Sequence, residues 1–86
     1  MEKIIENIKT QREQLKSKYY EFKSLREKEH DLTDKAIEDN NKQEFIEHNK
    51  LEREYEAKCD HISHAINDLG NSLYFLTGER VETFWG

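Results

Sequence analysis

The segment Asp39-Asn40-Asn41-Lys42-Gln43-Glu44 marks the place where the chain is expected to turn back on itself. Apart from glycine, asparagine is the residue that best tolerates the left-handed backbone conformation that ends a helix. Asn41, followed by Glu44 three residues later, also resembles a capping box in which Asn replaces the usual Ser or Thr. We therefore expect one helix to end and a second helix to begin at this segment.

A competing boundary lies at residues 30–34, where Asp31 or Thr33 could cap a new helix. This segment contains no Gly, Pro or Asn that would end the preceding helix. The sequence therefore favours the turn at residues 40–41 over a break at residues 30–34.

Apolar residues recur at helical spacing on both sides of the turn. The chain contains no proline and three glycines, all from residue 70 onward, so residues 1–69 lack the strongest helix breakers. Gly70 and Asn71 interrupt the second stripe, and a kink or a stop is possible there. The first stripe comprises Ile5, Ile8, Leu15, Tyr19 and Phe22, and the second comprises Tyr55, Cys59, Ile62, Ile66, Leu69, Leu73 and Leu76.

This pattern predicts an all-α fold, a long coiled-coil-like antiparallel helical hairpin over residues 1–78. The first helix is expected at about residues 2–39, the turn at 40–41 and the second helix at about 42–77. Residues 79–86 are expected to form a short C-terminal aromatic tail. Hydrophobic residues make up 34% and charged residues 38% of the sequence, so the apolar contact between the two helices, which we call the seam, is thin. Because a thin seam buries little apolar surface, we expect dimerisation into a four-helix bundle.

Polar residues fall at seam positions in the middle of the first helix. Arg12 and Arg26 occupy such positions, and we expect Arg26 to pair with Glu52 or Glu56 across the hairpin. His30 and His48 could approach each other in the same region, which would give a pH-sensitive contact. Polar seam residues of this kind fix register more than they add stability.

The composition argues against several classes of function. A net charge of −5 disfavours direct nucleic-acid binding, which normally needs a basic patch. The single cysteine, Cys59, excludes an internal disulfide and fits a reducing compartment. No apolar run approaches the roughly 20 residues that span a bilayer. We expect a soluble, cytoplasmic protein without a cofactor.

Cys59, Asp60, His61 and His64 form the only cluster that suggests a metal ion. Helical spacing places Cys59 on the inner face and both histidines on the outer face, so they cannot converge on one ion within a straight helix. We therefore predict no metal site. General acid and base catalysis needs a concave, partly dry site, which a two-helix hairpin does not offer, and we predict no catalytic residue and no enzymatic activity.

With the turn at residues 40–41, the free ends of both helices and the tail meet at one end of the hairpin, the open end. The tail aromatics are either an exposed anchor for a partner or a plug that folds back over Ile4, Ile5 and Leu73. The predicted partner or dimer interface comprises Ile4, Ile5, Ile8, Leu73, Tyr74, Phe75, Leu76, Phe84 and Trp85.

The leading functional hypothesis is a non-enzymatic protein interaction module, a small accessory or inhibitor protein of phage or mobile-element type that docks on a host protein. A second hypothesis is an acidic nucleic-acid mimic that inhibits a DNA-binding or RNA-binding enzyme through an acidic face of Glu47, Glu54 and Asp68.

A third hypothesis is a structural or secretion-partner hairpin, because the size and acidity resemble the WXG100-like helical hairpins that are exported with toxins. The Trp-x-Gly motif of that family lies in the turn between the helices. Here the turn is Asn40-Asn41, and the nearest match is Phe84-Trp85-Gly86 at the end of the tail. This departure leaves membership of the family unassigned.

Overall fold

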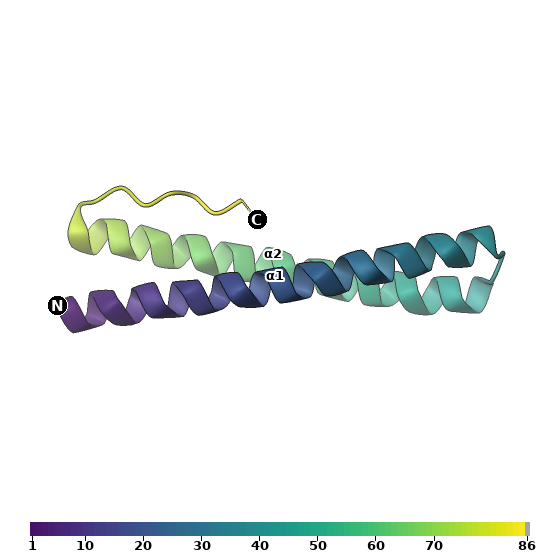
Figure 1. The fold of residues 1–86 in the computed structure, drawn as a ribbon. Coiled ribbons are helices and arrows are strands. Elements are labelled where there is room, and N and C mark those ends of the chain that lie inside the picture. Colours follow the sequence, from purple (N-terminus) through teal and green to yellow (C-terminus); the bar gives the residue numbers. More distant parts are fainter. Residues whose placement is uncertain (86) are drawn as a thin grey trace.

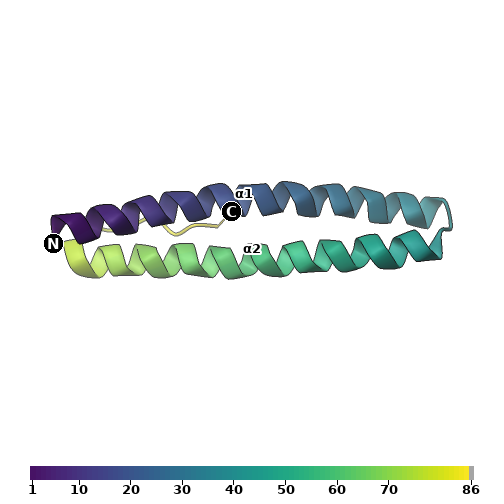
Figure 2. The ribbon, with the colours of Figure 1, turned by 90° about the horizontal axis from the view of Figure 1, so that it is seen from below.

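The computed structural model describes residues 1–85, and Gly86, the last residue of the predicted tail, lies outside the described residues. Two helices, α1 (Glu2–Glu38) and α2 (Lys42–Thr77), pack against each other in a body of 57 × 18 × 13 Å (Figure 1). Seen from below, they lie side by side along their whole length (Figure 2). The predicted all-α antiparallel hairpin is confirmed.

The turn between the helices is built by asparagine. Asn40 has a positive φ of 52°, and its N–H donates to the Ile37 carbonyl at 3.1 Å. Asn41 caps α2, because its side-chain oxygen accepts a hydrogen bond from the Glu44 backbone N–H at 3.2 Å. These bonds satisfy backbone groups that helix ends otherwise leave without partners.

Helix α1 continues without a break through residues 30–34, the competing boundary. Thr33 does not cap a new helix, since its hydroxyl donates to the Glu29 carbonyl one turn earlier at 2.8 Å. Helix α2 likewise continues through Gly70, so the glycine neither stops the helix nor ends the apolar stripe.

The seam between the helices is thin. Among residues 1–85, the buried apolar residues are Ala36, Cys59, Ile66 and Leu73, and only Ile66 is a large side chain with no exposure. Phe22 and Tyr55 stack across the middle with ring centroids 6.0 Å apart, and the Lys58 ammonium lies 5.1 Å from the Phe22 centroid. Such a seam leaves much of the hairpin's surface to be covered by other segments.

The chain reverses direction after α2 and adds a third layer. Gly78 ends the helix in the left-handed conformation (φ 71°), where its N–H donates to the Tyr74 carbonyl. The tail then runs back beside α2 from the open end towards the middle of the hairpin (Figure 1). The tail therefore belongs to the fold, although it forms neither helix nor strand over residues 78–85.

Candidate functional site

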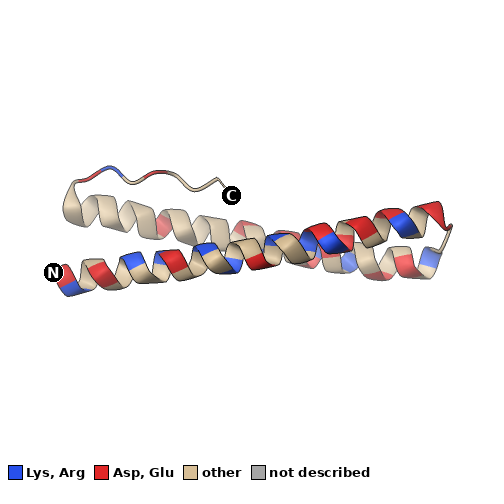
Figure 3. Ribbon diagram, viewed as in Figure 1, with Lys and Arg blue, Asp and Glu red and all other residues tan. Residues whose placement is uncertain are grey.

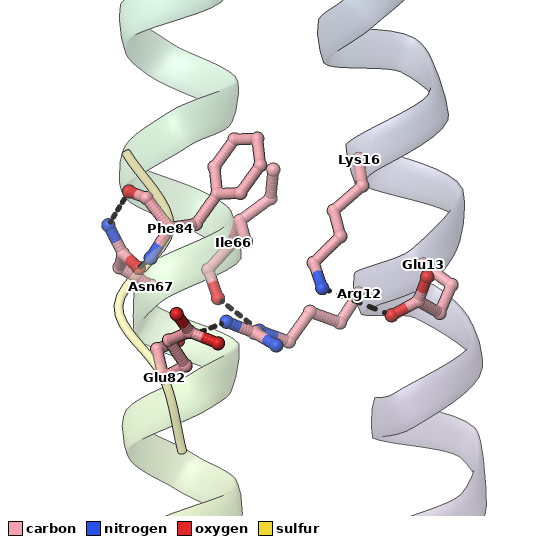
Figure 4. A network of polar contacts seen from close by, with 7 residues as sticks. All are labelled: Arg12, Glu13, Lys16, Ile66, Asn67, Glu82 and Phe84. Carbon is pink, nitrogen blue, oxygen red and sulfur yellow. Dashed lines mark hydrogen bonds and ion pairs between the residues drawn. The ribbon is translucent and has the colours of Figure 1, made fainter. Parts of the chain in front are cut away.

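The most specific polar contacts of the molecule join α1, α2 and the tail. Arg12 lies on α1 and is only 8% exposed. Its Nε donates to the Ile66 carbonyl on α2 at 3.1 Å, and its Nη2 donates to the Glu82 carbonyl in the tail at 2.9 Å (Figure 4). A rigid guanidinium can make both bonds at once because its donors point in fixed, divergent directions.

Asn67 on α2 holds the tail at a second point. Its side-chain oxygen accepts from the Phe84 backbone N–H at 2.8 Å, and its side-chain nitrogen donates to the Phe84 carbonyl at 3.0 Å (Figure 4). One amide side chain thus pairs with both backbone groups of a single residue. The extended conformation of the tail is fixed by this pairing.

The Phe84 ring packs against two tyrosines of α1. It meets the Tyr19 ring edge to face at 5.0 Å and the Tyr20 ring at 6.0 Å between centroids. Arrangements of this kind are favoured by the quadrupoles of the rings. Phe84 therefore lies near the middle of the hairpin and not at the open end, because six residues of extended chain after Gly78 span about 20 Å.

Gly70 explains why the tail fits so closely. A Cβ at this position would lie 3.3 Å from Cγ1 of Val81 and 3.4 Å from the guanidinium of Arg12. The absent side chain leaves the space in which both groups pack against α2. We call the set of residues that seats the tail the clasp, and it consists of Arg12, Tyr19, Tyr20, Asn67 and Gly70.

The sequence contained signals for the clasp that were not connected. Arg12 stood out as an arginine at a seam position, and Gly70 as an interruption of the helical stripe. Arg12 donates to two backbone carbonyl oxygens, which no pattern of charged residues reveals.

The prediction that Arg26 pairs with Glu52 or Glu56 is wrong for the described residues, where the Glu52 carboxylate accepts from His30 instead.

The nine residues of the predicted interface separate into two groups. The structure turns one group inward, since Leu73 is buried and Ile5, Ile8, Leu76 and Phe84 are half-buried. The other group remains exposed and comprises Ile4, Tyr74, Phe75 and Trp85. Trp85 is 88% and Phe75 86% exposed, which is unusual for rings of this size.

The exposed aromatic set, Tyr74, Phe75 and Trp85, lies on the half of the molecule where α2 carries few charges. Figure 3 shows the last turns of α2 without acidic or basic residues. Charges of both signs alternate over α1 and over the closed end of the hairpin, where the turn at residues 39–41 joins the two helices. Beside the tail lies a hollow of about 430 Å³ with both charged and aromatic residues in its lining, which consists of Arg12, Lys16, Tyr20, Glu82, Thr83, Phe84 and Trp85. The tail thus presents Trp85 at the edge of a hollow.

The three residues of the predicted acidic face, Glu47, Glu54 and Asp68, are all exposed on α2. At about 1.5 Å rise per residue they stand roughly 10 and 21 Å apart along the helix. Basic residues of the closed end are interspersed with the first two (Figure 3). The structure therefore separates these carboxylates and does not gather them into one cluster.

Two histidine–carboxylate pairs bridge the helices in the closed half. His30 Nδ1 donates to the Glu52 carboxylate at 2.7 Å, and His48 Nδ1 donates to the Glu29 carboxylate at 2.6 Å. The bond to Glu52 is the main cause that raises the pKa of His30 above its ordinary value, and the charge of Asp34 adds to it. His30 and His48 therefore each contact a carboxylate of the opposite helix.

The Cys59 cluster shows no convergence. Cys59 is buried, and its thiol faces the Tyr19 carbonyl at 4.0 Å, whereas His61 and His64 are exposed. Burial raises the pKa of the Cys59 thiol, which keeps it protonated near neutral pH. Within residues 1–85, no group of three or more His, Cys, Asp or Glu side chains is arranged to hold a metal ion.

Neither helix of the described chain is long and apolar enough to cross a membrane. Comparison with protein-family models, with curated proteins and with solved structures finds no match to this chain. The proposal below is therefore based on the exposed side chains and the contacts of the tail.

Proposed function

We propose that this chain is a non-enzymatic protein interaction module that docks on a partner protein through the exposed aromatic set. The observation that carries the proposal is the exposure of two large rings, Phe75 on the uncharged last turns of α2 and Trp85 at the edge of a hollow. Large rings left in water favour contact with a second apolar surface, and Trp and Tyr are enriched among residues that dominate binding energy.

The fixed position of Trp85 supports the same proposal. Its neighbour Phe84 is held by Asn67 through two backbone hydrogen bonds, so the Trp85 ring is presented from an ordered segment. A preordered contact residue loses less conformational entropy on binding than one in a free tail. The hollow beside Trp85 offers space for a side chain of the partner.

The exposed area also favours a partner. The chain exposes 6681 Å², whereas a compact monomer of 10.4 kDa exposes about 5400 Å². The difference exceeds the roughly 800 Å² that each partner buries in a standard interface. We propose a second copy of the chain as the simplest partner, and a host or other cytoplasmic protein that the chain regulates as the alternative.

Photo-crosslinking tests this proposal. A benzophenone amino acid in place of Phe75 or Trp85 is expected to form one discrete crosslinked product, whose mass distinguishes a second copy from another protein. The matched control replaces Ile46, which is also exposed but lies at the closed end of the hairpin. Crosslinking from position 46 alone, or from none of the three positions, would contradict the proposal.

A double substitution measures how much the two rings contribute to the binding affinity. Removing both rings in Phe75→Ser with Trp85→Ser is expected to weaken binding of the crosslinked partner about 100-fold, since each hot-spot residue contributes about 1.4 kcal/mol or more. The control pair is Ile37→Ser with Ile46→Ser, because it also removes two large exposed apolar side chains, but from the closed end of the hairpin. This control is expected to change the affinity less than threefold.

A further inference from the structure

The clasp holds the tail mainly through backbone atoms. All three hydrogen bonds between the clasp and the tail end on main-chain groups: the Glu82 carbonyl, the Phe84 N–H and the Phe84 carbonyl. Every residue type except proline can offer these groups. The polar part of the clasp therefore recognises an extended backbone and not one particular sequence.

Two side chains of the tail add the sequence requirement. Val81 fits over Gly70, and Phe84 fits against Tyr19 and Tyr20. The tail residues between and beside them, including Glu82 and Thr83, expose their side chains. The clasp thus selects an aliphatic residue followed, three positions later, by an aromatic residue.

The tail is attached in a way that permits exchange. It is joined to α2 at the single left-handed residue Gly78, and Arg80, Glu82 and Thr83 have exposed side chains. No backbone–backbone hydrogen bond joins residues 79–85 to one another or to a helix in the described chain, and the Glu79 N–H donates to the Thr77 hydroxyl at 3.1 Å. Release of the tail therefore breaks the three hydrogen bonds to the clasp and the ring contacts of Phe84, and it leaves the backbone hydrogen bonds of both helices in place.

From these observations we infer that the clasp is a binding groove for an extended peptide, and that the tail is its tethered resident ligand. The occupant that fits is an extended segment of a partner protein with an aliphatic residue and an aromatic residue three positions later. The groove is a second binding surface, separate from the exposed rings of Tyr74 and Phe75. Binding of the segment displaces residues 79–85 and takes Trp85 out of its ordered position, so docking through Trp85 and occupation of the groove are mutually exclusive states of the chain.

Competition with the tail sets the expected affinities. A short flexible tether holds a ligand at an effective concentration of about 1 mM, so the tail suppresses binding of any free peptide of similar intrinsic affinity. Weakening the tail without altering the clasp must therefore strengthen peptide binding. Phe84→Ala achieves this in the full chain, because Phe84 belongs to the tail and the clasp residues remain.

The test is a fluorescence anisotropy titration with a labelled synthetic peptide that has the sequence of residues 79–85 and blocked ends. Phe84→Ala is expected to bind the peptide at least tenfold more tightly than the wild-type chain. Adding Asn67→Ala to this variant is expected to abolish the gain, and a peptide with alanine in place of its phenylalanine is expected to bind at least tenfold more weakly. Val81→Ser provides a second tail-weakened variant if Phe84→Ala loses helicity by circular dichroism.

Equal binding by wild-type and both tail-weakened variants would overturn the inference and leave the clasp as a structural seat for the tail. Equal binding of the two peptides would overturn it as well. Neither result affects the crosslinks at Phe75 and Trp85, which test the proposed function separately. Conversely, tight peptide binding without crosslinks would support the groove while contradicting the exposed aromatic set as the docking surface.

Discussion

The two halves of the hairpin hold their helices together with different kinds of polar contact across the thin seam. In the half near the open end, the buried Arg12 guanidinium bonds to carbonyl oxygens of α2 and of the tail. In the closed half, half-exposed imidazole rings pair with carboxylates, as in His30 with Glu52. The first kind of contact depends on shape and on a third segment, whereas the second depends on protonation.

The difference indicates which half contributes more to the free energy of unfolding and which half responds to pH and salt. A buried charged donor is costly to leave without its acceptors, so the clasp should dominate the free energy of unfolding. Exposed ion pairs contribute less and respond to pH and salt. Variants in each half can therefore separate the two contributions.

The largest effect is expected from Arg12→Ala. This change removes two charge-assisted hydrogen bonds, each of which contributes about 1.5 kcal/mol or more, and leaves the space beside Gly70 unfilled. We expect the free energy of unfolding to fall by about 3 kcal/mol in urea titrations followed by circular dichroism.

The matched control is Arg53→Ala, because Arg53 is exposed on α2. This change is expected to alter the free energy of unfolding by less than about 0.5 kcal/mol. Arg12→Lys should recover less than half of the loss, since an ammonium group cannot reproduce the two divergent bonds. Similar stabilities of Arg12→Ala and Arg53→Ala would remove the distinction between the two halves.

A smaller effect is expected from Gly70→Ala, and its sign is informative. In an exposed helix this change stabilises by about 1 kcal/mol. Here the new Cβ would lie 3.3 Å from Cγ1 of Val81, so the tail would have to shift by a few tenths of an ångström, and overpacking typically costs about 1–3 kcal/mol. We expect a net loss of about 1 kcal/mol in the same urea titrations.

Two comparisons isolate the crowding. Asn71→Ala, at the next and exposed position of α2, is expected to be neutral or slightly stabilising. Val81→Ala combined with Gly70→Ala should destabilise less than the sum of the single changes, because the smaller tail residue makes room for the Cβ. Full additivity would show that the tail does not press on Gly70.

These variants also indicate how far the sequence could predict the molecule. The hairpin followed from Asn40-Asn41 and the repeating apolar stripe, because both are local signals that helix geometry reads directly. The clasp could not be predicted, since Arg12 lies 54 residues from Ile66 and 70 from Glu82. Its contacts depend on the register of three segments and on carbonyl groups that every residue possesses.

The tail illustrates the same limit. One sequence-based alternative had it fold back over Ile4, Ile5 and Leu73, and it does fold back, but along the hairpin as far as Tyr19. Its composition indicated aromatic residues without a helical period, which leaves the direction of each ring open. The structure turns Phe84 inward and leaves the adjacent Trp85 exposed because Asn67 fixes the backbone at residue 84.

The smallest expected effect concerns the closed half and its pH dependence. The ring of His30 faces Glu52 from α2 through Nδ1 and Asp34 from α1 through Nε2, at 2.7 and 3.4 Å. Both nitrogens meet carboxylates, so the doubly protonated ring fits the site, and the pKa of His30 is raised, first by the hydrogen bond to Glu52. Asp31 adds a weaker charge effect in the same direction.

A raised pKa in the folded state stabilises the fold only while the ring is protonated. The contribution of His30 is therefore fully present below the unfolded-state value of about 6.5 and is lost as pH rises through the higher folded-state pKa. The difference in urea midpoint between wild type and His30→Gln should shrink from pH 6 to pH 8. The matched control is His64→Gln, because His64 is exposed on α2. A difference that grows with pH would mean that the imidazolium does not stabilise the closed half, and the contrast with the clasp would have to be explained without protonation.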